Sequence, residues 1–467
     1  MSISTELLYK LQQIVGENYV FTDEQTRKNY GHDETEDLSF PPNVVVKPAT
    51  ALEISAIMKL ANEYYTAVVP IGGQTGLSGG ALCILKGIGL STERLNKIIE
   101  IDEKNGQVIT EPGVITQVLR DAVAEKGLFY PVDPSSMGSC FIGGNIAENS
   151  GGARAVKYGV TKDYVLNLEV VLPNGEIILT GANTLKNSTG YNLTQLMVGS
   201  EGTLGIVTKA VLKLWPKNSH NVLMLVPFFK AEQACEAVSA IFRAGIVPSA
   251  LEFMERDAID WTLKFVDGIS VTTKPEHQAH LLIEVDGNYP EILMLEAEKI
   301  MEVVEQFEID EVLFADTEEQ KNALWKMRRS VAEAVKANSV YKEEDTVVPR
   351  YELPTLLKGI KTIGTKYGFQ SVCYGHAGDG NLHVNIIKGT MTDDNWKSEV
   401  PKGIREIFEL TVSLKGTLSG EHGIGLVQKD YMNIRFSKSH LELMGQIKYI
   451  FDPNNIMNPG KILPENL

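Results

Sequence analysis

Three glycine clusters in the first half of the chain constrain its fold more than any other feature. Five glycines occur in PIGGQTGLSGG, residues 70–80, five in GSCFIGGNIAENSGG, residues 138–152, and three in GSEGTLG, residues 199–205. Glycine allows backbone N–H groups to surround anionic oxygens, because no Cβ stands in the way. For any one cluster, a tight turn between strands is the simpler interpretation. Three clusters in one stretch favour a large ligand that carries phosphate.

Two common phosphate-binding motifs are absent. The chain contains no GxGxxG, and its Gly460-Lys461 pair is followed by Ile462 rather than by Ser or Thr. A Rossmann nicotinamide site and a P-loop are therefore both disfavoured. Loops could still hold a dinucleotide.

Composition narrows the class of protein further. The 467 residues suffice for two large domains, and 44 basic against 60 acidic side chains give a net charge of −16. This charge repels nucleic acid and anionic lipid, so neither is an expected partner. The four cysteines form no CxxC pair and indicate thiols in a reducing compartment, the cytoplasm. We expect no signal peptide and no transmembrane segment, since the uncharged stretch 64–85 is rich in glycine.

The pattern of apolar residues predicts an α+β or α/β fold with a domain boundary near residue 218. Short apolar runs and glycine turns fill residues 44–214, and Asn174-Gly175 predicts a hairpin between 168–172 and 177–180. Longer helices, including one over 317–337, follow the boundary. We expect an N-terminal helical segment over 1–43, a ligand-binding domain over 44–218, a second domain over 219–425 and a C-terminal segment over 426–467.

A histidine constellation lies in the second half, in YGHAGDGNLHVNI, residues 374–386, and SGEHGIG, residues 419–425. His376 and His383 bracket a glycine turn that could bring both imidazoles to one point, with Glu421 as a third ligand. Two histidines and a carboxylate suit an open divalent metal site. A hydrogen-bonded structural role is the alternative, and the adjacent His422 adds acid–base chemistry as a third.

An arginine occupies an apolar helical position. Leu324, Arg328, Val331 and Val335 follow a 4-3-4 spacing, so Arg328 is expected among core residues. An inward arginine needs an anion, which is either a buried Asp or Glu or the carboxylate of a substrate. Lys342, Arg350 and Lys336 lie nearby in sequence and favour the substrate.

In this order, the glycine clusters, GHAGDGNLH, SGEHGIG and DPNNIMNPGK resemble the FAD-linked dehydrogenases of D-2-hydroxy acids. This family includes D-lactate dehydrogenases, D-2-hydroxyglutarate dehydrogenase and the flavin subunit of glycolate oxidase. The resemblance covers residues 44–463. It implies an FAD-binding domain of the vanillyl-alcohol-oxidase (PCMH) type, an α+β cap domain with an antiparallel sheet and a C-terminal segment that returns to the flavin.

The resemblance also implies residue roles. FAD, bound without a covalent link because Gln74 follows the Gly-Gly pair, would contact loop residues from all three clusters and the C-terminal segment. These residues are Gly72, Gly73, Gln74, Thr75, Gly76, Leu77, Ser78, Gly138, Ser139, Gly143, Gly144, Asn145, Asn149, Gly152, Glu201, Ile206 and Asn458. His376, His383 and Glu421 match the family's metal ligands, for zinc or manganese, and His422 its general base. Arg328 matches its carboxylate anchor, and Asn385 a substrate-side position.

The implied reaction is oxidation of a small D-2-hydroxy acid to the 2-oxo acid by proton abstraction and hydride transfer to flavin N5. Ala332 stands where hydroxyglutarate enzymes have threonine, and Lys342 matches their second lysine only in a shifted register. The stretch around Arg350 is more like the lactate and glycolate members, whereas GSCFIGGN is more like the hydroxyglutarate enzymes. The distal part of the substrate therefore stays open.

Other functions fit parts of the pattern. An FAD-dependent alcohol or sugar-lactone oxidase using oxygen would not need the two histidines, an ether-lipid synthase would not reduce flavin, and a regulatory flavin subunit would not need His422. The electron acceptor is open among a quinone, an electron-transfer flavoprotein and an iron–sulfur subunit, because the chain has no iron–sulfur or haem motif of its own. A homodimer is a further expectation.

Overall fold

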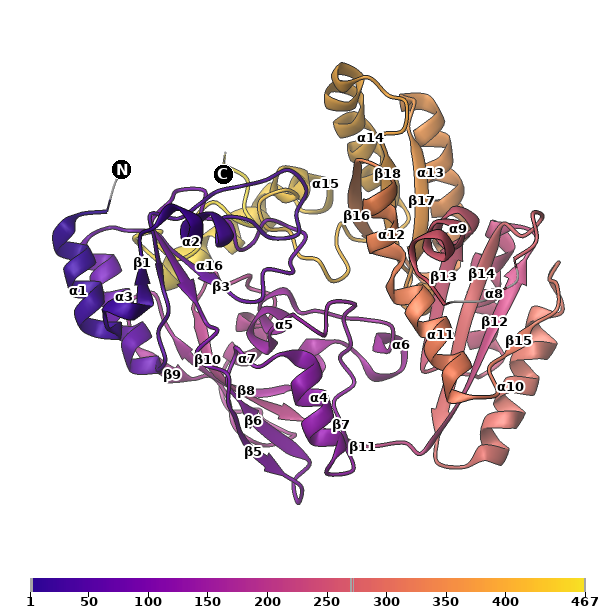
Figure 1. The fold of residues 1–467 in the computed structure, drawn as a ribbon, viewed down its shortest axis with the longest axis horizontal. Helices are drawn as coiled ribbons and strands as arrows, with labels where there is room; N and C mark the ends of the chain where they lie inside the picture. The colour runs from indigo at the N-terminus through magenta and orange to yellow at the C-terminus, as the bar shows by residue number, and fades with distance from the viewer. Residues whose placement is uncertain (1–2, 269–270, 272, 466–467) are drawn as a thin grey trace. The chain divides into compact units, whose positions relative to one another are not determined.

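The computed structural model describes residues 3–268, 271 and 273–465 (Figure 1). The chain divides into two compact units. Unit 1 comprises residues 1–151, 160–217 and 421–467, and unit 2 comprises residues 152–159 and 218–420. Unit 2 thus includes an eight-residue insertion from within the glycine-rich half.

The N-terminal part of unit 1 is a four-stranded sheet in the order β1-β2-β4-β3. Its strands are β1 (Val20–Phe21), β2 (Val44–Val46), β3 (Val68–Ile71) and β4 (Ile88–Ser91), and β2, β4 and β3 run parallel. Helices α1 (Thr5–Val15) and α3 (Ala51–Glu63) bury Leu7, Leu11, Ile54 and Met58 in one core with these strands. A parallel sheet covered by amphipathic helices buries its apolar strands, and β3 leads directly into the first glycine cluster.

A second sheet in unit 1 is antiparallel and has the order β5-β6-β10-β8-β9. Its strands are β5 (Ile98–Asp102), β6 (Gln107–Thr110), β8 (Val165–Val171), β9 (Ile177–Leu179) and β10 (Ile206–Lys213). The expected hairpin around Asn174-Gly175 is confirmed as β8–β9. Gly175 has φ +85°, and a Cβ there would lie 2.8 Å from the Ser55 carbonyl, so glycine is required.

Shorter elements and the C-terminal segment complete unit 1. They are η1 (Glu17–Tyr19), α2 (Glu24–Asn29), α4 (Thr116–Ala124), β7 (Leu128–Phe129), α5 (Ile142–Glu148), η2 (Thr161–Asp163), α7 (Leu193–Met197), β11 (Trp215–Pro216), η5 (Lys429–Tyr431), α15 (Met432–Arg435) and α16 (Lys438–Phe451). After α16 the chain returns to β3, where Val68 donates its N–H to Ile456 and accepts from Asn458 N. The C-terminal segment therefore packs beside the strand that carries the first glycine cluster.

Unit 2 is built on a seven-stranded antiparallel sheet in the order β15-β12-β14-β13-β17-β18-β16. The strands are β12 (His220–Phe228), β13 (Ala250–Glu255), β14 (Ala279–Gly287), β15 (Leu313–Phe314), β16 (Tyr341–Val347), β17 (Gln370–Gly375) and β18 (Asn381–Ile387). Its helices are α6 (Ala155–Tyr158), α8 (Ala231–Arg243), α9 (Arg256–Phe265), α10 (Pro290–Val304), α11 (Glu318–Arg329), α12 (Val331–Asn338), α13 (Leu353–Tyr367) and α14 (Asp393–Ser413), with η3 (Arg350–Glu352) and η4 (Ala377–Asp379). The expected antiparallel sheet is confirmed.

One face of this sheet has a core that α9, α11 and α12 complete. Met254 of β13, Tyr374 of β17 and Ile387 of β18 pack there with Trp325 and Val331. The single helix expected over 317–337 is instead two helices, because Ser330 has φ −88° and ψ 0° and separates α11 from α12. Arg328 thus lies in the last turn of α11 and is buried, as its spacing predicts.

Among the described residues, none of the helices combines the length and the apolar character that crossing a membrane requires.

Candidate functional site

The two histidines of the second constellation come together within unit 2. His376 follows β17, η4 forms the turn, and His383 lies in β18 opposite Tyr374 of β17. The two rings have centroids 5.4 Å apart and ligand atoms within 4.8 Å, and both residues are buried. Gly380 closes the turn at φ +78°, where a Cβ would lie 1.9 Å from the Val348 carbonyl. The sequence of this turn therefore fixes the spacing of the two imidazoles.

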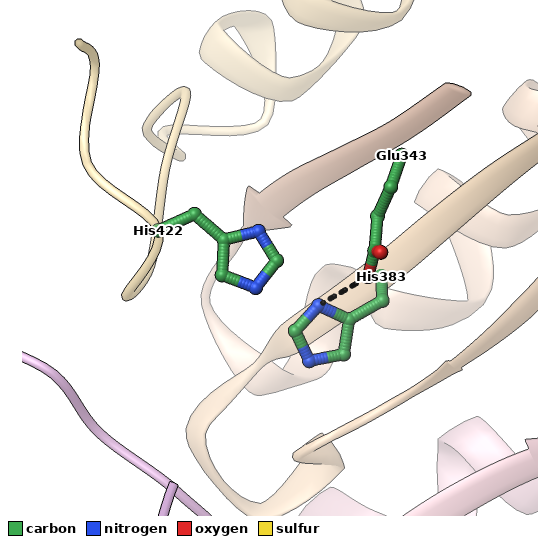
Figure 2. Close-up of side chains that lie close together, drawn as sticks. All are labelled: Glu343, His383 and His422. Atoms are coloured by element: carbon green, nitrogen blue, oxygen red, sulfur yellow. Dashed lines mark ion pairs between the residues drawn. The ribbon is translucent and has the colours of Figure 1, made fainter. Parts of the chain in front are cut away.

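Each imidazole has a carboxylate at Nδ1. His376 Nδ1 lies 2.9 Å from both oxygens of Glu252 on β13. His383 Nδ1 lies 3.5 Å from Glu343 Oε1 and 3.7 Å from Asp345 Oδ1, both on β16. Figure 2 shows the Glu343 side chain directed at His383. A carboxylate hydrogen-bonded at Nδ1, as Glu252 is to His376, fixes the tautomer and orientation of an imidazole that binds a metal through Nε2.

Arg328 contacts the same buried carboxylate. Its Nη2 lies 2.6 Å from Glu252 Oε2, and the Glu252 side chain is fully buried. Burial by itself would raise the pKa of Glu252, but the charges of His376 and Arg328 outweigh it and hold the pKa below its ordinary value. Arg328 Nε is buried and has no hydrogen-bond partner among the described residues. The anion expected for Arg328 is therefore Glu252 at one nitrogen, while Nε faces no acceptor.

Asn385 joins this site and Lys342 does not. Asn385 lies two residues beyond His383 and is completely buried, and its side-chain nitrogen and oxygen have no hydrogen-bond partner in the described chain. Lys342 pairs with Ile386 in the register between β16 and β18. Because side chains alternate along a strand, Lys342 points to the face opposite that of His383 and Asn385.

Arg350 supports the turn between the histidines. Its Nε donates to the Gly378 carbonyl, and its guanidinium lies 3.9 Å from the centroid of the Phe242 ring. Arg350, which the sequence suggests as a residue that contacts the substrate, therefore supports the turn by a hydrogen bond to its backbone.

In unit 1, the first two glycine clusters pack against one another. A Cβ on Gly73 would lie 2.5 Å from the Ser139 carbonyl and 3.2 Å from Cys140 Cα. Gly143 instead packs against a residue outside both clusters, since a Cβ there would lie 2.6 Å from Pro112 Cβ. By contrast, a Cβ on Gly138 or Gly144 would have no described atom within 4 Å. Some glycines thus allow two loops to meet, whereas others leave bare backbone open to a ligand.

The polar side chains expected around FAD have varied partners within unit 1. Asn145 donates to Thr116 Oγ1 at 2.6 Å, and Asn149, at φ +57°, accepts from Lys162 N. Gln74 donates to the carbonyls of Asn29 and His32. The other expected contacts Gly72, Thr75, Gly76 and Leu77 share the Gln74 loop, and Ile206 begins β10. Ser78 Oγ is buried with no hydrogen-bond partner among the described residues.

Asn458 and Glu201 tie the C-terminal segment to the glycine clusters. Asn458 Nδ2 donates to the carbonyls of Gly80 and Glu201 at 3.0 and 2.8 Å. The Glu201 carboxylate accepts the N–H groups of Ile424 and Gly425 at 2.8 and 2.6 Å. Glu201 therefore clamps the chain just after Glu421 and His422.

Glu421 and His422 begin the last part of unit 1. Glu421 Oε2 accepts the Gly151 N–H at 3.1 Å, and Gly152 is the first residue of the insertion that belongs to unit 2. Gly420, which precedes Glu421, donates its N–H to Asp345 Oδ2 at 2.7 Å within unit 2.

Two buried acids of unit 1, Glu148 and Glu201, have raised pKa values. Burial raises the pKa of Glu201 to about 7, although two backbone N–H groups oppose the shift. Burial and the charges of Glu201 and Asp33 raise the pKa of Glu148 well above its ordinary value. Burial lowers the pKa of Lys461 to about 8. Glu148 and Glu201 pack against Gly423, where a Cβ would clash with the Glu148 carboxylate.

Sequence reasoning missed the carboxylates that surround the histidines. Glu252 lies in the middle of β13, whose other acid, Glu255, ends the strand, and Glu343 and Asp345 flank Glu344 in a run of three acids in β16. An acid inside an apolar strand, or a run of acids in a strand, is the signal that could have found them, because some of these side chains must then face the sheet interior. Their pairing with particular histidines needs the strand order.

Comparisons with known proteins identify both halves of the chain. Residues 42–181 match a family model described as an FAD binding domain, and residues 217–462 match the C-terminal domain of FAD linked oxidases. The glycolate oxidase subunit GlcD of Bacillus subtilis is 40% identical, over 99% of this chain and 98% of the relative. A D-lactate dehydrogenase of Anaerostipes hadrus is 37% identical over 98% of each chain. A D-2-hydroxyglutarate dehydrogenase of Stutzerimonas stutzeri is 33% identical, also over 98% of each.

The solved structure of p-cresol methylhydroxylase is similar in fold, with a TM-score of 0.80 at 16% identity over 99% of this chain and 97% of that one. The fold class and the family expected from the motifs are thereby confirmed. The protein is an oxidoreductase with an FAD-binding domain of the vanillyl-alcohol-oxidase (PCMH) type, and it belongs to the family of FAD-linked oxidases.

Proposed function

We propose that this protein is an FAD-dependent dehydrogenase that oxidises a D-2-hydroxy acid to the 2-oxo acid. The observation that carries the proposal is the arrangement of His376 and His383, each with a carboxylate at Nδ1, beside Arg328 and Asn385. These polar groups lie together, and buried, at one end of the order β13-β17-β18-β16 of the sheet. Relatives named for glycolate, D-lactate and D-2-hydroxyglutarate support the substrate class.

FAD would be held by the glycine clusters of unit 1. The open backbone at Gly138 and Gly144 and the buried Ser78 hydroxyl fit a ligand rich in oxygen atoms. Gln74 replaces the histidine that links flavin in related proteins, so the cofactor would be non-covalent. When bound, FAD supplies the acceptor for the C2 hydride.

A divalent metal, zinc or manganese, would bind His376, His383 and Glu421. The Nδ1 carboxylates fit such a site, because they leave the Nε2 atoms of both imidazoles as its ligand atoms. Glu421 follows Gly420, whose N–H is held by Asp345. Such a metal lowers the pKa of a hydroxyl group that it binds.

The substrate would be oriented by Arg328 and Asn385. Arg328 Nε and both polar atoms of Asn385 are buried and lack partners within the described chain, as groups that bind a carboxylate and a hydroxyl would be before substrate arrives. His422 would take the proton of the 2-hydroxyl group. Lys342 and Arg350 are weaker candidates for substrate contact, since one faces the opposite side of the sheet and the other holds Gly378.

Anaerobic titration of the yellow protein with D- and L-2-hydroxy acids tests this function. Bleaching of the flavin absorbance by the D isomers is expected, and its loss after metal removal, with FAD retained, supports the metal. Equal bleaching by L isomers would contradict the orientation. Bleaching only by alcohols or sugar lactones, with full activity in metal-free protein, would favour the alternative oxidase.

Electrons would pass from the reduced flavin to a separate acceptor, either a quinone, an electron-transfer flavoprotein or an iron–sulfur subunit. We further propose a cytoplasmic homodimer. The four cysteines are all buried thiols, which fits a reducing compartment. Stopped-flow reoxidation with each acceptor class identifies the acceptor, and light scattering measures the oligomer.

A further inference from the structure

We propose that the Glu343 carboxylate restricts the site to 2-hydroxy acids that carry a single carboxylate. This inference rests on the proposed function and deepens it, because it names the substrate class within the 2-hydroxy acids. It places D-lactate or glycolate above D-2-hydroxyglutarate.

The strand register places Glu343 at the site. Glu343 of β16 pairs with Asn385 of β18, and Asp345 pairs with His383. All four side chains therefore share one face of the sheet. Glu343 Oε1 lies 3.5 Å from His383 Nδ1 and accepts the Tyr374 hydroxyl at 3.3 Å, and its side chain is only 5% exposed. Figure 2 shows the Glu343 carboxylate directed at the His383 ring, and its dashed line marks this ion pair.

Buried polar groups beside Glu343 indicate that a ligand binds here. Asn385 is fully buried, and neither its amide nitrogen nor its amide oxygen has a partner in the described chain. Arg328 is 4% exposed, and its Nε is likewise without an acceptor among described atoms. Leaving such groups unsatisfied is costly in an interior, so their arrangement favours a polar ligand that completes them. Glu343 is paired with Asn385 across β16 and β18, so a ligand that binds Asn385 would lie near the Glu343 carboxylate.

The local charges would disfavour a second carboxylate. Two guanidinium groups lie on this face among the described residues, and both already contact a carboxylate: Arg328 contacts Glu252 at 2.6 Å, and Arg154 contacts Glu284 at 2.6 Å. Lys342, adjacent to Glu343 in the chain, faces the other side of the sheet. Burial of Glu343 reduces the screening of its charge by water, so a dicarboxylate would be repelled more strongly here than at an exposed position. A neutral substrate side chain meets no such repulsion.

A comparison of matched substrates on the wild-type protein tests the inference. D-2-hydroxyglutarate and its 5-amide have the same length and differ by one charge. We expect kcat/KM for flavin reduction to be about tenfold or more higher for the amide, and also higher for D-lactate. Calorimetry of product binding, which needs no turnover, should show pyruvate binding at least tenfold more tightly than 2-oxoglutarate.

Glu343→Gln removes the charge and keeps the shape. The ratio of kcat/KM for the amide to kcat/KM for the acid should fall by about tenfold in this variant. The affinity for 2-oxoglutarate should rise by a similar factor. The matched control is Glu333→Gln, an exposed acid on α12 that should leave both ratios unchanged. A ratio unchanged within twofold in folded Glu343→Gln protein, or a wild-type preference for the acid, would overturn the inference. If the variant loses its fold, the wild-type comparison decides alone.

The two proposals fail differently. Absence of flavin reduction by every 2-hydroxy acid would refute the proposed function and this inference with it. Flavin reduction by 2-hydroxy acids without the amide preference would refute only the role of Glu343.

Discussion

Arg328 serves two anions at once in this interpretation. Its Nη2 contacts Glu252, and its Nε is left for the substrate carboxylate. Arg328→Lys supplies a single ammonium that cannot meet both, so we expect KM to rise about tenfold or more and kcat to fall. Steady-state kinetics with D-2-hydroxy acids measures the change, and Arg329→Lys, at the neighbouring position on the same helix, is the control. Unchanged KM in the Arg328 variant would mean that Arg328 only neutralises Glu252.

His422 is proposed as the base that takes the proton of the substrate's 2-hydroxyl group. His422→Asn keeps a similar size but cannot accept the hydroxyl proton, so flavin reduction should slow by about two to four orders of magnitude. FAD content, read from the visible spectrum, should stay the same. His440→Asn, on α16, is a control for loss of an imidazole elsewhere in the same segment. Flavin reduction within a few-fold of wild type would assign proton abstraction to another residue.

At the scale of elements, the glycine clusters of residues 70–80 and 138–152 pack against each other, so a change in one loop should displace the other. Gly73→Ala would place a Cβ 2.5 Å from the Ser139 carbonyl, so one loop must move, at a cost of roughly 1–3 kcal/mol. We expect a lower melting temperature and FAD binding weakened by about tenfold, measured by FAD titration of the deflavinated protein. Gly445→Ala within α16 is the control, because a Cβ there meets nothing within 4 Å. FAD affinity equal to wild type in Gly73→Ala would contradict a role for this loop contact.

The elements differ in how far sequence predicts them. The hairpin at Asn174-Gly175 follows from local chemistry, namely residues that tolerate positive φ. The break at Ser330 does not follow from local chemistry. One continuous helix and two helices separated at Ser330 both satisfy the apolar pattern of this segment. Glu252 could not be assigned to His376 and Arg328 either, since that pairing depends on β13 and β17 becoming neighbours across more than 100 residues. Local signals thus found the histidines and the arginine, and only the strand order found the carboxylates between them.

At the scale of the whole molecule, the cofactor should be released intact on unfolding. Gln74 occupies the position of the linking histidine and donates to backbone carbonyls, and an amide of this kind forms no flavin bond. Acid precipitation should therefore move all yellow colour to the supernatant, as absorbance at 450 nm would show. Colour retained in the washed pellet would demonstrate a covalent link elsewhere.

The free energy of unfolding of the whole molecule should depend on pH because of the buried acids in unit 1. Glu201 titrates near 4.5 when unfolded, but burial raises its pKa to about 7 in the native state. Between these values the native state holds the extra proton, so the free energy of unfolding falls as pH rises, by up to about 1.4 kcal/mol per pH unit. Below pH 4.5 and above pH 7 this contribution is flat.

The variant Glu201→Gln tests whether the free energy of unfolding falls with rising pH because of Glu201. The variant should show a shallower fall in melting temperature between pH 4.5 and pH 7 than wild type. Some slope should persist, because the pKa of Glu148 is raised in the same direction. Glu176→Gln, an exposed acid in the β8–β9 turn, should retain the wild-type slope. If Glu201→Gln and wild type had equal slopes, Glu201 would be ionised throughout, and Ile424 and Gly425 would be clamped by a permanent charge.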